Sequence, residues 1–177
     1  KSLKDRIESI REEAETAVRQ GSTCLVLSDK SISNKKASIP SILTVGAVHS
    51  HLVKHGLRGY CSLNVECSDA MDTHSFAILI GVGATTVNPY LAIDSIYQRF
   101  EKKLFGKSDF ETCVNKFKKS IDAGLLKIMS KMGISVISSY RGGCNFEAVG
   151  LSRAIVSDYF PGMSSRISGI GIIGIEK

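Results

Sequence analysis

Seven residues lie at the ends of four predicted strands of this chain, and they are its best candidates for binding chemistry. These residues are Asp29, Glu66, Asn88, Ser139, Tyr140, Arg141 and Gly142. Ligands of open parallel sheets bind beyond the carboxyl ends of the strands, so we expect the seven residues to share one edge of a sheet. The sequence therefore predicts an anion contact or an interdomain contact there.

The Arg-Gly-Gly sequence at residues 141–143 is the strongest of these signals for an anion. A guanidinium beside free backbone N–H groups at a helix N-terminus can hold a phosphate or a carboxylate. One glycine pair, however, is not the full phosphate-loop or dinucleotide fingerprint. The alternative is that the glycines form a tight turn and that Arg141 pairs with Glu66, with Glu147 or with an adjoining domain.

Two histidines have the spacing of a metal-binding pair. His51 and His55 lie four residues apart and would share one face of a helix. The glutamate of an H-E-x-x-H motif is missing, and the neighbouring Val48, Leu52 and Val53 are typical of a packed helix. We therefore expect no metal ligand, and no pattern in the sequence indicates a catalytic residue or a cofactor-binding residue.

Alternating strands and helices must position these residues. Hydrophobic periodicity predicts strands at 24–29, 60–67, 85–88 and 134–138, longer helices at 2–20, 40–55, 73–82, 90–104 and 108–132, and short helices at 145–149 and 153–159. This alternation is typical of an α/β fold with a parallel sheet. Four strands cannot close a barrel of eight, so we expect an open parallel β-α-β sheet resembling half of a (β/α)8 barrel. The length suits a single α/β domain over residues 1–177.

Composition argues against nucleic-acid and membrane partners. The net charge of +6, from 23 basic and 17 acidic residues, is spread along the chain and indicates a solvated surface. The longest apolar run, at residues 76–82, is far shorter than the roughly 20 residues that a bilayer requires. Five scattered cysteines are typical of a reducing compartment, so we expect a cytoplasmic location.

Four segments resemble the large subunit of glutamate synthases. They are IPSILTVGAVHSHLVKHGLR at 39–58, FAILIGVGATTVNPYLA at 76–92, GLLKIMSKMGISVISSYRGGCNFEAVGL at 124–151 and SRISGIGI at 165–172. Their order matches the central domain of that family, and the chain resembles the C-terminal half of this domain. The family converts glutamine and 2-oxoglutarate into two glutamates at the expense of a reductant.

The resemblance implies a structural role. In the family, an amidotransferase domain releases ammonia, a flavin barrel aminates and reduces 2-oxoglutarate, and the central domain links the two. It implies FMN and an iron-sulfur cluster in the whole enzyme, but no cofactor and no catalysis in this segment alone. Cys61 and Cys67 have the spacing that opens the family's cluster motif, yet Asp72 stands where its third cysteine would follow.

The implied partners are the flavin and amidotransferase domains, on the same or a separate chain. Assembly into a homo-oligomer is a further possibility. Two other readings compete with the resemblance. One is a stand-alone small α/β domain that binds an anion or phosphate through Arg141. The other is a structural interaction module that is recruited through an exposed sheet edge.

Overall fold

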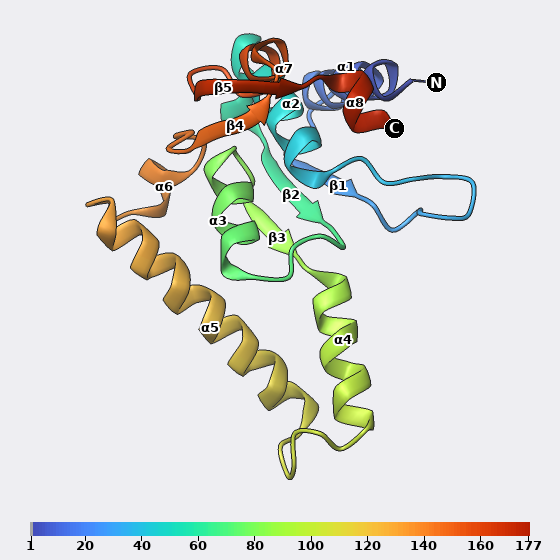
Figure 1. Ribbon diagram of the computed structural model, residues 1–177, viewed down its shortest axis with the longest axis vertical. Coiled ribbons are helices and arrows are strands. Elements are labelled where there is room, and N and C mark those ends of the chain that lie inside the picture. The colour runs from blue at the N-terminus through green and yellow to red at the C-terminus, as the bar shows by residue number, and fades with distance from the viewer. Residues whose placement is uncertain (1) are drawn as a thin grey trace.

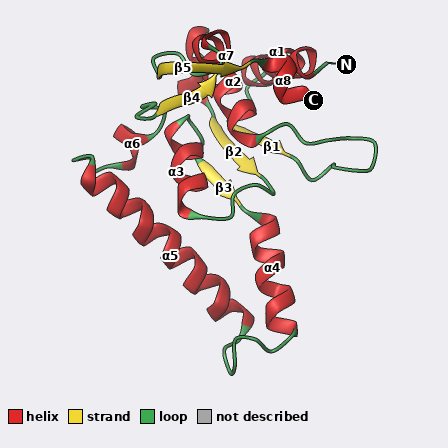
Figure 2. Ribbon diagram, in the orientation of Figure 1, coloured by secondary structure: helices red, strands yellow, loops and turns green. Residues whose placement is uncertain are grey.

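A computed structural model describes residues 2–177 as an α/β protein with two small parallel sheets (Figures 1 and 2). The elements follow in the order α1 (Leu3–Arg19), β1 (Cys24–Ser28), α2 (Ser41–Lys54), η1 (Arg58–Tyr60), β2 (Ser62–Glu66), α3 (Thr73–Gly81), β3 (Thr86–Asn88), α4 (Tyr90–Glu101), α5 (Phe110–Lys131), α6 (Ile137–Tyr140), β4 (Glu147–Leu151), α7 (Arg153–Tyr159), β5 (Ser164–Ile170) and α8 (Ile172–Glu176). No helix within residues 2–177 is long and apolar enough to cross a membrane.

The first sheet contains β1, β2 and β3, side by side in chain order and parallel. Helices α2 and α3 form the crossovers, as parallel neighbours require. In the register, Ser28 is opposite Glu66, and Glu66 is opposite Asn88, so the three strands end together. The first three predicted strands are therefore confirmed, and so is the α/β class.

The main core lies where α1 and α2 pack together and against this sheet. The central strand β2 buries alternate side chains, with Leu63 and Val65 almost fully inaccessible. From α2, Val45, Val48 and Leu52 complete the same cluster. Alternation on the strand and helical spacing on α2 thus bury the side chains that their periodicities predict.

A buried arginine joins three helices within this core. Arg11 on α1 is only 6% exposed, and its Nε donates to the carbonyl of Ala47 on α2 at 3.2 Å. Its Nη2 donates to the backbone carbonyl and to a carboxylate oxygen of Asp158 on α7, both at 3.2 Å. The guanidinium also lies over the ring of Tyr159, 4.7 Å from the centroid. One side chain therefore satisfies groups from segments far apart in the sequence.

Helices α4 and α5 project from the body and converge at the loop that joins them (Figure 1). They pack together through Phe110, whose ring lies edge-on to Tyr97 at 5.4 Å. Near the body, α5 packs on α3, with the rings of Phe117 and Phe76 6.4 Å apart. The α5 helix thus extends the α3 side of the core.

The prediction of a fourth strand at 134–138 is wrong. After α5, Gly133 has a φ of +71° and the N–H of Ile134 donates to Met129, which turns the chain back at the helix end. Residues 137–140 then form the short helix α6, which buries Tyr140 against α3. The apolar run thus leads from the end of α5 into α6, and the first sheet has three strands where four were expected.

The remaining strands form a separate sheet. The predicted short helix at 145–149 is also wrong, because Glu147–Leu151 is strand β4. It pairs in parallel with β5, and α7 connects the two. Figure 2 shows this second sheet beside α7. Residues 153–159 form a helix as predicted.

Candidate functional site

The carboxyl ends of the first sheet bring three predicted site residues together. Asp29, Glu66 and Asn88 follow or end β1, β2 and β3, which stop level with one another. The amide of Asn88 donates to Glu66 Oε1 at 3.2 Å, and the backbone N–H of Asp29 donates to the carbonyl of Glu66. We call Asp29, Glu66, Asn88 and their polar partners the carboxyl-edge cluster.

Asp29 ties the end of β1 to the loop after β2. One carboxylate oxygen accepts from the backbone N–H of Ser68 at 2.9 Å and from its hydroxyl at 2.7 Å. Burial raises the pKa of the Asp29 carboxyl, but the hydrogen bonds from Ser68 and the nearby Tyr90 hydroxyl outweigh it and leave the pKa below the usual value. The carboxyl is therefore ionised and oriented at neutral pH.

Glu66 is the centre of the cluster. Its carboxylate accepts from the Lys30 ammonium at 2.8 Å and from the Ser28 hydroxyl at 2.7 Å. The bond from Lys30, then that from Ser28, lowers the pKa of Glu66. A general acid or base needs a pKa near the working pH, and a carboxylate held ionised by this many donors does not have one. The arrangement is suited to joining loops, not to proton transfer.

A cleft opens beside the carboxyl-edge cluster. It has a volume of about 690 Å³ and lies between α1, β1 and the loop that follows β1. Its wall includes Ser28, Asp29 and Glu66, and also apolar side chains such as Ile10 and Ile39. The cleft could receive a segment of another domain with both apolar and polar groups.

The other predicted residues lie at the opposite edge of the sheet. The hydroxyl of Tyr140 donates to the carbonyl of Ala77 at 3.0 Å. The N–H of Gly142 donates to the carbonyl of Ile80 at 3.2 Å. These carbonyls belong to α3, whose C-terminal end precedes the start of β3. The expectation that Ser139, Tyr140, Arg141 and Gly142 share one edge with Asp29 is therefore wrong, because their segment is not a strand of this sheet.

The Arg-Gly-Gly loop caps the C-terminus of α3. The N–H groups of Gly142 and Cys144 donate to the carbonyls of Ile80 and Gly81, and that of Gly143 donates to Tyr140. Terminal carbonyls of a helix have no partner within the helix, so the loop satisfies them. These N–H groups are consequently not free for an anion, and the tight-turn alternative describes the backbone.

Arg58, which the sequence did not single out, organises this amino edge. Its guanidinium donates to His49 Nδ1 at 3.1 Å, to the carbonyl of Cys61 at 2.6 Å and to the carbonyl of Gly83 at 2.8 Å. Burial, and secondly the charge of Arg58, lower the pKa of His49 to about 4. His49 is therefore a neutral acceptor. No sequence signal could have found this set, because its members come from three separate segments.

Arg141 lies close enough to Arg58 for their charges to interact. Burial and, more weakly, the charge of Arg141 lower the pKa of Arg58. The Nε of Arg141 is buried and has no hydrogen-bond partner in the described chain. The intramolecular partners suggested for it are engaged elsewhere, since Glu66 pairs with Lys30 and Glu147 with Arg166. The Nε of Arg141 is thus a buried donor without a partner within residues 2–177.

The buried thiols of Cys61 and Cys67 and the partly buried thiol of Cys144 are poorly suited to nucleophilic attack. Burial, followed by the charge of Asp69, raises the pKa of Cys67 to about 12. Burial also raises the pKa of Cys61 and of Cys144. Because the thiolate is the reactive form, these cysteines are expected to be inert.

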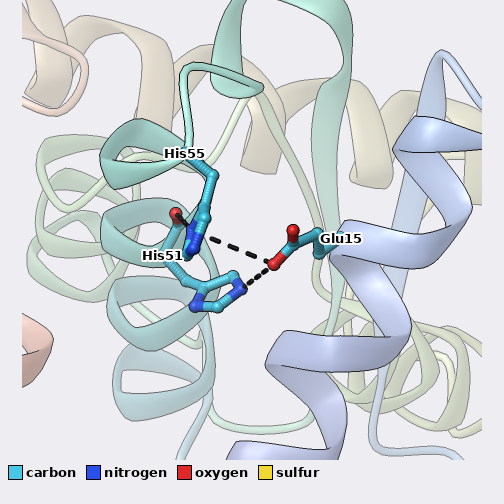
Figure 3. A group of neighbouring side chains, drawn as sticks. All are labelled: Glu15, His51 and His55. Carbon is cyan, nitrogen blue, oxygen red and sulfur yellow. Dashed lines mark hydrogen bonds and ion pairs between the residues drawn. The ribbon is translucent and has the colours of Figure 1, made fainter.

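A separate group of possible metal ligands lies between α1 and α2 (Figure 3). His51 and His55 lie on one face, as their spacing predicts, and Glu15 from α1 faces them. His51 Nε2 lies 2.7 Å from Glu15 Oε2, and His55 Nδ1 lies 3.9 Å from the same oxygen. The sequence suggested the two histidines but not Glu15, because packing of the two helices supplies it.

We expect Asp29→Asn to lower the free energy of unfolding by about 1 kcal/mol at neutral pH, because an amide is a weaker acceptor than a carboxylate. The pKa of Asp29 is lowered in the folded state, so the carboxylate stabilises the fold above its ordinary pKa. This contribution is lost as the pH falls through the lowered value. The difference from wild type should therefore shrink below about pH 4.

Urea unfolding at a series of pH values measures this difference. Asp122→Asn is the matched control, because Asp122 is exposed on α5 and its replacement should change stability little at any pH. An Asp29→Asn penalty that is independent of pH would contradict the assigned role of the charge.

Known proteins that are similar to this chain are described as glutamate synthases. The family model described as glutamate synthase central domain matches residues 1–152. The glutamate synthase [NADPH] large chain of Azospirillum brasilense is 57% identical over 176 residues, which cover 99% of this chain and 12% of that protein. The corresponding large chain of Bacillus subtilis is 44% identical over 93% of this chain and 11% of its own length.

A relative with another named electron donor also matches. The ferredoxin-dependent glutamate synthase of Pyropia yezoensis is 42% identical, with 100% of this chain and 12% of that protein covered. The 177-residue chain therefore spans only about an eighth of the length of the relatives that it matches.

Proposed function

Because this chain belongs to the glutamate synthase central-domain family, we propose that it is a structural segment of a glutamate synthase that holds the amidotransferase and flavin domains in register. The complete enzyme would form two glutamates from glutamine, 2-oxoglutarate and a reductant, as an oxidoreductase. FMN and an iron-sulfur cluster would lie in its other parts. This segment would hold neither, and it would not be catalytic alone.

The observation that carries the proposal is the apolar surface of the second sheet. Val149 on β4 is 65% exposed, and Ile167 on β5 is 61% exposed. Ile170, at the end of β5, is 46% exposed, and Ile173 on α8 is 70% exposed. Parallel sheets are normally covered on both faces, and a two-stranded sheet is marginal by itself. We propose that the flavin domain covers the surface formed by Val149, Ile167, Ile170 and Ile173, here called the β4–β5 face.

The engagement of the polar residues supports the same role. Glu66 is saturated by Lys30, Ser28 and Asn88, and the buried thiol of Cys67 has a pKa of about 12. Groups that are held in these states stabilise a shape but do not exchange protons or attack a substrate. A domain that works by position requires only the shape.

Arg141 is the residue of the predicted site that we propose for a contact outside the segment. Its Nε is buried without a partner in residues 2–177, and the charge of Arg58 lies nearby. A carboxylate of an adjoining domain, or a bound anion, would satisfy it and offset the repulsion between the two guanidiniums. This observation is also what favours the second candidate function, an anion-binding domain.

We extend the proposal to the first sheet and to the setting of the protein. Residues 1–177 would form one α/β domain, and β1 to β3 would be part of an open, half-barrel-like sheet whose exposed Val26 side chain is covered in the complete enzyme. The enzyme would be cytoplasmic, and it could form homo-oligomers.

Charging the β4–β5 face tests the proposal in the complete enzyme. We expect the double variant Val149→Lys, Ile167→Lys to reduce glutamine-dependent glutamate formation at least about tenfold, because two buried ammonium groups would open the domain contact. Glutamine hydrolysis should persist, and so should glutamate formation from added ammonia. Parallel assays of these three rates measure the loss of coupling.

Leu104→Lys is the matched control, because Leu104 is 66% exposed but lies at the far end of the α4–α5 projection. It should leave all three rates near wild type. Equal rates in the double variant and the wild type would refute the proposed contact. Loss of glutamine hydrolysis and ammonia-dependent synthesis together would refute it as well, since the defect would then be global.

A further inference from the structure

We propose that Glu15, His51 and His55 bind a zinc ion between α1 and α2 (Figure 3). Their ligand atoms all lie within 4.8 Å of one another. Within residues 2–177 this is the one group of three or more potential metal ligands that lie so close together. Zinc binds two imidazole nitrogens and one carboxylate oxygen at about 2.0–2.2 Å, often with water as a fourth ligand. The site is independent of the role proposed above for the segment.

The two distances from Glu15 Oε2 to the histidine nitrogens are close to what zinc requires. Two ligands of a tetrahedral zinc ion lie about 3.4 Å apart. The pair His51 Nε2 and Glu15 Oε2 is 2.7 Å apart, and the pair His55 Nδ1 and Glu15 Oε2 is 3.9 Å apart. One distance must therefore open, and the other must close, by roughly half an ångström. Side-chain rotations alone can supply such shifts.

The carboxylate of Glu15 is already oriented for one ligand bond. Arg19 on the same helix holds the other oxygen, Oε1, at 2.8 Å. This leaves Oε2 directed at the two histidines, as Figure 3 shows. Ligands of metals are commonly held by such outer partners, which fix their orientation. The positive charge of Arg19 opposes a cation, and the single negative charge of Glu15 is shared between Arg19 and the ion.

The histidine protons can move without a change in total charge. His55 Nδ1 now donates to the carbonyl of His51 at 2.8 Å, so binding through Nδ1 requires the proton to occupy Nε2. Likewise, zinc at His51 Nε2 leaves the proton of the neutral ring on Nδ1. The carbonyl of His51 loses one bond but still accepts from the N–H of His55. The cost is one exposed hydrogen bond.

The geometry favours a metal over a simple helix contact because three ligand groups converge from two elements. His51 is only 14% exposed at its side chain and Glu15 22%, whereas His55 is 35% exposed. The first two are thus held by packing, and the third borders solvent, where an ion can enter. A bound ion would join α1 to α2 about one helical turn from the Arg11–Ala47 contact.

Calorimetric titration of the 177-residue chain with zinc chloride tests the proposal. We expect one zinc ion per chain and a thermal midpoint that rises with zinc concentration, since binding to the folded state stabilises it. Glu15→Gln and His55→Gln should each weaken binding at least about tenfold. With cobalt(II) as a probe, the visible spectrum should indicate nitrogen and oxygen ligands without a thiolate charge-transfer band.

His74→Ala and Cys24→Ser are the matched controls, because each removes an exposed potential ligand outside the group. Both should bind zinc like wild type. His55 borders solvent, so His55→Gln tests the site even where replacing His51 disturbs folding. No saturable binding by the wild type would overturn the proposal, and so would unchanged affinity in His55→Gln or a loss of affinity in Cys24→Ser.

Discussion

Replacing Arg11 with alanine is expected to lower the free energy of unfolding by about 3 kcal/mol. The guanidinium is buried among α1, α2 and α7, and it donates to two backbone carbonyls and to the carboxylate of Asp158. Its removal leaves the Ala47 carbonyl without this donor and opens space beside the Tyr159 ring. The effect stays below that of a fully buried pair because the Asp158 side chain is 54% exposed and remains hydrated.

Two further variants separate charge from packing. Arg11→Met keeps most of the apolar stem and should recover about a third of the loss, because long side chains also stabilise through their methylenes. Arg6→Ala on the same helix is the control, since Arg6 pairs with Glu13 on the surface and should contribute at most about 0.5 kcal/mol. Urea unfolding measures all three. An Arg11→Ala variant as stable as Arg6→Ala would contradict the assignment.

Local periodicity was sufficient to predict the first half of this fold. The strands around Leu63 and Val87 are short segments between helices, with alternating burial on the first, and each one ends in a polar residue. The same logic placed Asp29, Glu66 and Asn88 at one edge, where parallel register brings them together. In these units local preference and long-range packing agree, which is why the sequence alone was informative.

The prediction for the second half of the fold is wrong for a physical reason. Residues 134–138 are apolar enough for a strand, but pairing with a sheet edge is a long-range event that no local pattern encodes. Here α5 packs on α3, Gly133 turns the chain, and Tyr140 is buried against Ala77. The loop of Arg141 is thereby carried to the amino edge of the sheet.

The partners of Arg58 and of His51 could not be predicted from spacing. Arg58 reaches the carbonyls of Cys61 and Gly83, and Glu15 meets His51 across a helix interface. These contacts depend on the angle and distance at which elements pack. Sequence patterns identify a face of a helix but not the residue opposite it.

Gly83→Ala is expected to lower the free energy of unfolding by about 4 kcal/mol. Gly83 has a φ of +125°, where an L side chain is strained. A Cβ there would also overlap the ring of His49, which Arg58 holds in place at 3.1 Å. Because the carbonyl of Gly83 accepts from the same guanidinium, a shift of the backbone would break the contact that joins α2, β2 and the loop before β3.

Two glycines and one double variant resolve the causes of this loss. Gly59→Ala should change stability by at most about 0.5 kcal/mol, because its Cβ would meet open space. Gly21 has a φ of +96°, and a Cβ added there would have no atom within 4 Å. Gly21→Ala therefore measures the backbone strain alone, about 1–2 kcal/mol. If overlap with His49 accounts for the rest, Gly83→Ala combined with His49→Ala must be more stable than the sum of the single penalties predicts. Strictly additive penalties would show that strain alone acts at Gly83, and that the His49 ring does not restrict this edge.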